Sequence, residues 1–141
     1  MSFLYNIAAC NTKDASCFLL FIVSGHVVGR VNRDFVRRLL SWPEIFDITD
    51  ASVSLMDRGD GLAHRSEKVA DALERLVKQG VLRPFHGEQY AAYADGTPGP
   101  LLLIDRAMAP CFGIRAFGQH VNAFVRSPDG LKMWISRRAE D

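Results

Sequence analysis

The feature that most constrains the fold is a pair of strand-like runs near the C-terminus, Ile114–Arg126 and Leu131–Ser136. Between them stands Ser127-Pro128-Asp129-Gly130, in which proline pre-sets one backbone angle and Asp-Gly tolerates a positive φ. Apolar, β-prone runs joined by four such residues predict an antiparallel hairpin. Because an isolated hairpin is marginally stable in water, we expect this one to be the first part of a larger sheet.

Side chains along the two runs are expected to alternate between the faces of the hairpin. One face should carry Val121, Ala123 and Val125, and the other His120, Asn122 and Phe124. We also expect Met133 and Ile135 to lie on the face of Val121 and Val125. An incomplete sheet leaves an edge with unpaired N–H and C=O groups, and such edges recruit other chains. The sequence therefore predicts self-association through the hairpin of residues 114–136.

The whole chain predicts an α+β fold in which antiparallel hairpins pack with two main helices. Further strands are expected at Phe18–Val23, His26–Val31, Ile45–Ile48, Ser52–Leu55, Gln89–Ala94 and Leu101–Arg106. Apolar spacing predicts helices over Phe3–Asn11, over residues 33–41 with Asn32 as the cap, and over Ser66–Lys78 with Ser66 as the cap. In the last helix, Leu73 and Leu76 belong to the apolar stripe that should face the core.

Composition excludes several classes of function. The net charge of +1 leaves no strong electrostatic footprint for nucleic acid or for an anionic membrane. Cys10, Cys17 and Cys111 are odd in number and form no C-x-x-C pair, which favours free thiols over disulfides or a zinc site. The apolar run Cys17–Val23 is too short to span a bilayer, and the first residues lack the basic segment of a signal peptide. We therefore expect a cytoplasmic protein.

Two blocks around the predicted hairpin carry a more specific signal. They are Ala109-Pro110-x-Phe112-Gly113-x-Arg115-Ala116-x-Gly118-x-His120-Val121-Asn122 and Asp129-Gly130-Leu131-Lys132-x-Trp134-Ile135-x-Arg137-Arg138. Weaker ones are Ala9-Cys10-Asn11, Val27-Val28-Gly29-Arg30-Val31 and Arg83-Pro84-x-x-Gly87-Glu88-x-Tyr90. Together the blocks resemble two-domain Nudix hydrolases, in which a domain of unknown function precedes the Nudix domain. The resemblance implies an accessory domain over residues 1–106 and the opening strands of an incomplete Nudix domain over residues 107–141.

The resemblance also implies a function for the parent protein. Nudix hydrolases cleave a diphosphate linkage, and this subfamily points to a thiamine diphosphate derivative or a nucleoside diphosphate as the small-molecule substrate. The parent would use Mg²⁺ or Mn²⁺, whereas this chain alone is expected to hold no cofactor and to be inactive because it lacks the catalytic box. The alternative is a non-catalytic module that binds a ligand or a partner protein.

One segment imitates the catalytic box. Gly61-x5-Glu67-x7-Arg75 matches the first three fixed positions of G-x5-E-x7-R-E-U-x-E-E-x-G-U. The chemistry needs several carboxylates on one helical face to hold the metal ion, but the next position is Leu76 and the later glutamate positions are Gln79 and Gly80. We therefore interpret this segment as an amphipathic helix that packs on the core.

Four residues are candidates for substrate binding: His120, Asn122, Arg137 and Arg138. The resemblance places the face of His120 and Asn122 toward the substrate cleft, while the plainer interpretation is a solvated outer face. Arg137-Arg138 could bind a diphosphate through bidentate guanidinium contacts, or could simply be a charged strand end. No catalytic residue and no metal ligand is assigned.

Overall fold

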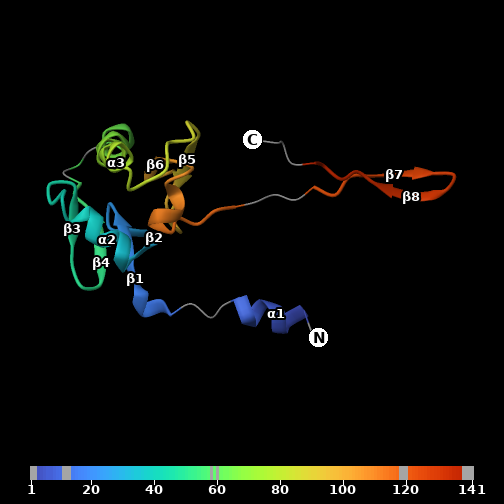
Figure 1. The fold of residues 1–141 in the computed structure, drawn as a ribbon, viewed down its shortest axis with the longest axis horizontal. Helices are drawn as coiled ribbons and strands as arrows, with labels where there is room; N and C mark the ends of the chain where they lie inside the picture. Colours follow the sequence, from blue (N-terminus) through green and yellow to red (C-terminus); the bar gives the residue numbers. More distant parts are fainter. Residues whose placement is uncertain (1–2, 11–13, 58, 60, 118–120, 138–141) are drawn as a thin grey trace.

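The computed structural model describes residues 3–10, 14–57, 59, 61–117 and 121–137 of the chain. The fold is α+β, as predicted. Figure 1 shows a packed body that is built from two sheets and two helices, with helix α1 (Phe3–Cys10) and the hairpin of β7 and β8 outside it. No helix in the described ranges combines the length and the apolar character that crossing a bilayer requires.

The larger sheet of the body has four strands: β1 (Phe18–Val23), β2 (His26–Asn32), β3 (Phe46–Ile48) and β4 (Ser52–Leu55). Their order is β2-β1-β4-β3. The antiparallel pairs β1–β2 and β3–β4 are the two predicted hairpins. The join between them is a parallel pairing of β1 with β4, which local sequence patterns do not reveal.

Two helices lie in the body, α2 (Arg33–Leu39) and α3 (Leu62–Lys78). The cap of α2 is confirmed, because the Asn32 side chain accepts a hydrogen bond from the N–H of Asp34 at 2.8 Å. The apolar stripe of α3 is confirmed as well, since Leu73 and Leu76 are buried in the core.

The predicted cap of α3 is wrong. The helix begins one turn earlier, with Gly61 as its N-cap. Ser66 therefore lies inside the helix, where its hydroxyl donates to the carbonyl oxygen of Leu62 at 2.7 Å. The same hydroxyl accepts a hydrogen bond from the N–H of Leu103 at 2.9 Å, so Ser66 ties the helix to the second sheet.

The second sheet pairs β5 (Gln89–Ala92) with β6 (Leu102–Asp105), and α3 packs against β6. Two short 3-10 helices complete the body, η1 (Ala15–Cys17) and η2 (Ala109–Phe112).

An aromatic cluster around Phe112 joins η2 to the core. The Phe112 ring lies 4.7 Å from that of Phe21, 5.5 Å from that of Phe35 and 6.2 Å from that of Phe46, measured between ring centroids. Residues 108–114 thus pack in the same core as the strands before them. The division into an accessory domain over residues 1–106 and the opening strands of a Nudix domain over residues 107–141 stays a prediction.

The C-terminal hairpin consists of β7 (Phe124–Ser127) and β8 (Gly130–Met133), joined at the predicted turn. The long first strand that was expected from Ile114 is wrong, because Ile114 is buried in the body and residues 114–117 form no strand. The register also corrects the predicted faces. Phe124 lies opposite Met133, so Met133 shares the face of Phe124 and not that of Val125.

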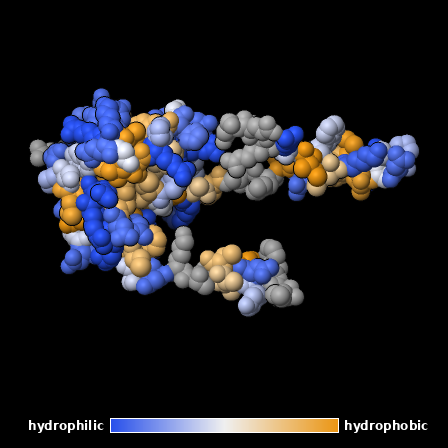
Figure 2. All heavy atoms as spheres, in the orientation of Figure 1, coloured by the Kyte–Doolittle hydropathy of each residue, from blue (hydrophilic) through white to orange (hydrophobic). Residues whose placement is uncertain are grey.

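Exposed apolar side chains lie on this hairpin (Figure 2). Phe124 and Met133 are exposed on one face, and Val125 and Trp134 on the other. Helix α1 also exposes apolar side chains, namely those of Leu4, Tyr5 and Ile7. The buried apolar core of the described residues therefore belongs to the body alone.

Candidate functional site

Two glycines bring distant parts of the body into direct backbone contact. Gly29 lies in β2, and a Cβ added there would overlap the carbonyl oxygen of Phe112. Gly113 follows η2 with φ +55°, and a Cβ added there would overlap the carbonyl oxygen of Arg30. Only glycine permits both this close approach and the positive φ at Gly113.

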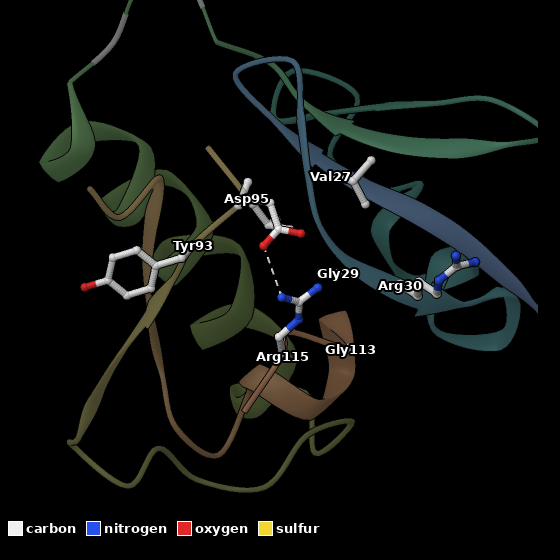
Figure 3. A pocket seen from close by; sticks show the side chains of 9 residues that line it. Val27, Gly29, Arg30, Tyr93, Asp95, Gly113 and Arg115 are labelled. Carbon is white, nitrogen blue, oxygen red and sulfur yellow. Dashed lines mark hydrogen bonds and ion pairs between the residues drawn. The ribbon is translucent and has the colours of Figure 1, made fainter. Parts of the chain in front are cut away.

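A hollow of about 260 Å³ opens beside the glycine contact (Figure 3). Its walls are residues 27–30 of β2, residues 93–95 after β5, and Gly113 with Arg115. Figure 3 shows the side chains of Arg115 and Asp95 pointing toward each other, whereas those of Tyr93 and Arg30 point away from this pair. The hollow is therefore lined mainly by backbone and by one ion pair.

We call residues 113–117 the strap, because they carry the chain from the core to the hairpin. The Tyr90 hydroxyl accepts a hydrogen bond from the N–H of Phe117 at 3.0 Å and donates to the carbonyl oxygen of Arg115 at 3.3 Å. The guanidinium of Arg115 also meets the Asp95 carboxylate at 3.2 Å. Both charged side chains are exposed, by 66% and 89%, so this ion pair contributes little and Tyr90 is the firmer tether.

Asp105 is the one buried charged residue in the described part of the chain. Its carboxylate accepts backbone hydrogen bonds from His86 at 3.0 Å, Gly87 at 2.8 Å and Ala107 at 2.8 Å. Burial acts to raise the pKa of Asp105, but the three N–H donors outweigh it and hold that pKa below its ordinary value. Asp105 therefore fixes the connection that leads into β5.

Glu88 follows this connection and is fully exposed. Its carboxylate meets the guanidinium of Arg106 at 2.7 Å. The hydrogen bond and the charge of Arg106 lower the pKa of Glu88. The pair joins the start of β5 to the end of β6.

The predicted substrate-binding residues do not gather at the hollow. Asn122 and Arg137 are exposed on the hairpin side of the chain, and neither lines the hollow. His120 and Arg138 lie outside the described residues. The role of all four in binding a diphosphate stays a prediction.

In the described ranges, no three His, Cys, Asp or Glu side chains are grouped so as to hold a metal ion. The segment that imitates the Nudix box forms part of α3, and Leu76 at its fourth fixed position is buried in the core.

The three cysteines differ in exposure, since Cys10 and Cys17 are exposed. All three are free thiols, and Cys111 is half-buried. Burial raises the pKa of the Cys111 thiol, which disfavours the nucleophilic thiolate.

Sequence patterns missed the glycine contact and the strap, because the partners are far apart in the chain. One signal was present, however. Gly29, Tyr90 and the strap come from three separate blocks that resemble Nudix hydrolases, Val27–Val31, Arg83–Tyr90 and Ala109–Asn122. Gly29 packs against Gly113 at the start of the strap, and Tyr90 is hydrogen-bonded to the strap.

A family model described as a domain of unknown function, DUF4743, matches residues 2–116. The chain is 26% identical over 149 residues to "Nudix hydrolase 20, chloroplastic" of Arabidopsis thaliana, covering 97% of this chain and 40% of the relative. It is 28% identical over 142 residues to "Nudix hydrolase 24, chloroplastic" of the same plant, covering 97% and 39%. An uncharacterized protein of Saccharomyces cerevisiae is 26% identical over 102 residues, covering 69% and 29%. The chain spans about two-fifths of the length of the two plant relatives.

Proposed function

The chain belongs to the DUF4743 family of domains of unknown function, and from this premise we propose that it is the N-terminal portion of a Nudix-type hydrolase acting on a diphosphate. Two relatives that carry the name Nudix hydrolase align with 97% of the chain. The proposed substrate is a thiamine diphosphate derivative or a nucleoside diphosphate, and the parent would use Mg²⁺ or Mn²⁺.

The observation that carries this proposal is the two-faced apolar hairpin. Phe124 is 64% exposed on one face, and Trp134 is 72% exposed on the other. A sheet with one solvated face would alternate apolar and polar side chains, whereas apolar side chains on both faces are typical of a strand pair that is covered on both sides. Opening strands of a Nudix domain would receive such cover from the rest of that domain.

Within this proposal the body is an accessory domain and the strap holds the next domain in place. The tether at Tyr90 and the glycine contact at Gly113 restrain the last residues before the hairpin. Arg137, which follows β8 at the end of the hairpin opposite its turn, remains a proposed contact for the diphosphate, because a guanidinium binds phosphate oxygens in a bidentate manner.

Reading the gene beyond the codon for Asp141 tests the proposal. We expect an open frame that encodes G-x5-E-x7-R-E, with the glutamates that residues 61–83 lack, within the next few tens of codons. A stop codon directly after Asp141 would overturn the hydrolase proposal.

That second outcome would favour the other candidate, a module that binds a ligand or a partner protein without catalysis. The hollow between β2 and the strap is the observation in its favour, since it presents Arg115, Asp95 and open backbone to a small polar ligand. For either candidate we propose a cytoplasmic location, with which the three free thiols are consistent. The two plant relatives are named chloroplastic.

A further inference from the structure

The outer edge of β8 has free hydrogen-bonding capacity. The Trp134 N–H donates to the carbonyl oxygen of Ala123 at 2.8 Å, and Val125 lies opposite Lys132. In an antiparallel pair, alternate residues direct their backbone groups toward the partner strand. The backbone groups of Lys132 and Trp134 therefore point toward β7, and those of Leu131 and Met133 point away from it.

Nothing in the described part of the chain pairs with this edge, because β7 and β8 form a sheet of two strands. The edge is also unprotected. Lys132 is the only charged residue in Gly130–Ile135, and that stretch holds no proline. Natural sheets normally guard an exposed edge with charges, proline or a bulge.

We propose that β8 is a self-association edge, on which the β8 of a second copy pairs antiparallel about a two-fold axis at Met133. The symmetry makes the surface complementary to itself, as a closed dimer requires. Met133 meets Met133 of the second copy, and Leu131 meets Ile135 of the second copy. These are the residues whose backbone groups point outward, so both copies gain ladder hydrogen bonds at once.

The charges select this register. Lys132 comes to lie opposite Trp134 of the second copy, where a cation and an aromatic face attract each other. Moving the axis to Lys132 would also match the outward groups, but it would oppose two lysines directly, which is destabilising.

This pairing joins two hairpins into one sheet of four strands. Phe124 lies opposite Met133 in each hairpin, so the apolar side chains of both copies form one continuous row across the sheet. A sheet of three or more strands with an apolar face is stable where a lone hairpin is not. The inference goes beyond the proposed hydrolase function, in which the rest of the Nudix domain would cover the same strands.

Amide exchange of the purified chain at low and high protein concentration tests the proposal, together with sedimentation velocity. We expect a dimer at high concentration, with the N–H groups of Leu131 and Met133 becoming protected as it forms. The N–H groups of Lys132 and Trp134 should change less, because they already face β7. Protection at Phe124 and Arg126 instead would assign the interface to the β7 edge and overturn the proposal.

The variant Met133→Lys places two like charges on the axis and should weaken dimerisation by about tenfold or more. Its matched control is Leu40→Lys, which changes an exposed leucine of the body in the same way and should leave dimerisation unchanged. Circular dichroism checks that both variants fold. A wild-type chain that stays monomeric at every concentration, or a dimer that Met133→Lys does not weaken, would contradict the proposal.

Discussion

Gly29 in β2 packs its backbone directly against the backbone of Gly113 at the start of the strap. The contact joins the four-stranded sheet to the segment that leads out of the core. It also places Phe112, the residue before Gly113, among the rings of Phe21, Phe35 and Phe46. The position of the strap thus depends on the absence of two Cβ atoms.

The variant Gly29→Ala should therefore destabilise the body. The new Cβ would overlap the Phe112 carbonyl oxygen and lie 2.9 Å from that of Gly113, and backbone atoms cannot move aside as a side chain can. We expect a loss of about 1–3 kcal/mol in the free energy of unfolding, measured by urea denaturation. Gly99→Ala is the matched control, since a Cβ there meets nothing within 4 Å, and it should change stability by less than about 0.5 kcal/mol. Equal stability of the two variants would contradict the close contact.

Replacing a buried leucine of α3 with alanine should lower the free energy of unfolding by more than Gly29→Ala does. Leu73 and Leu76 are both buried, so replacing either with alanine leaves a cavity and should cost about 2–5 kcal/mol. Asp71→Ala on the exposed face of the same helix should cost less than about 0.5 kcal/mol. A small loss from Leu76→Ala would reopen this face as a functional surface.

Asp105→Asn should reveal a buried carboxylate through the pH dependence of stability. The folded pKa of Asp105 lies below its unfolded value, so the carboxylate stabilises the fold near neutral pH. This contribution falls as the pH drops below about 4 and is lost once the pH passes the folded pKa. The variant should lose about 1–3 kcal/mol near neutral pH, and its difference from the wild type should shrink in acid.

Urea denaturation over a series of pH values measures this difference. Glu88→Gln is the control. Because Glu88 is exposed and its ion pair with Arg106 is solvated, its free energy of unfolding should differ from that of the wild type by much less. A difference between Asp105→Asn and the wild type that stays constant into acid would contradict the assigned role.

Removing the Tyr90 hydroxyl tests the hydrogen bonds that tether the strap. Tyr90→Phe removes the hydroxyl that accepts from the Phe117 N–H, so hydrogen exchange at Phe117 should become faster. Tyr93→Phe removes a hydroxyl from an exposed tyrosine of the same strand region and should leave exchange at Phe117 unchanged. Unaltered exchange in Tyr90→Phe would mean that the strap is held by other contacts.

Local signals predicted much of this fold, and long-range contacts account for the errors. Asn32 caps its helix as expected, because capping involves neighbouring residues only. Ser66 has the chemistry of a cap, yet its hydroxyl serves Leu62 within the helix and Leu103 of the second sheet. The parallel pairing of β1 with β4 likewise joins residues that lie about thirty positions apart.

The candidate site was harder to predict than the fold. The apolar run from Ile114 has the composition of a strand, but Ile114 is drawn into the core beside Phe112. The face of Met133 was misassigned because a two-residue loop sets the register to Phe124 opposite Met133. The hollow at Arg115 depends on a contact between two glycines that are far apart in the sequence, and composition does not predict such a contact.

The most direct test of the central claim is a hydrolysis assay of the purified chain of residues 1–141 with Mg²⁺ or Mn²⁺ and either thiamine diphosphate or ADP-ribose. The account predicts no turnover above a sample quenched with EDTA, because the described residues offer no cluster of metal ligands and Leu76 is buried where the Nudix box requires a glutamate. Turnover that EDTA abolishes would show a catalytic centre within this chain and would contradict its assignment as the accessory, non-catalytic portion of a hydrolase.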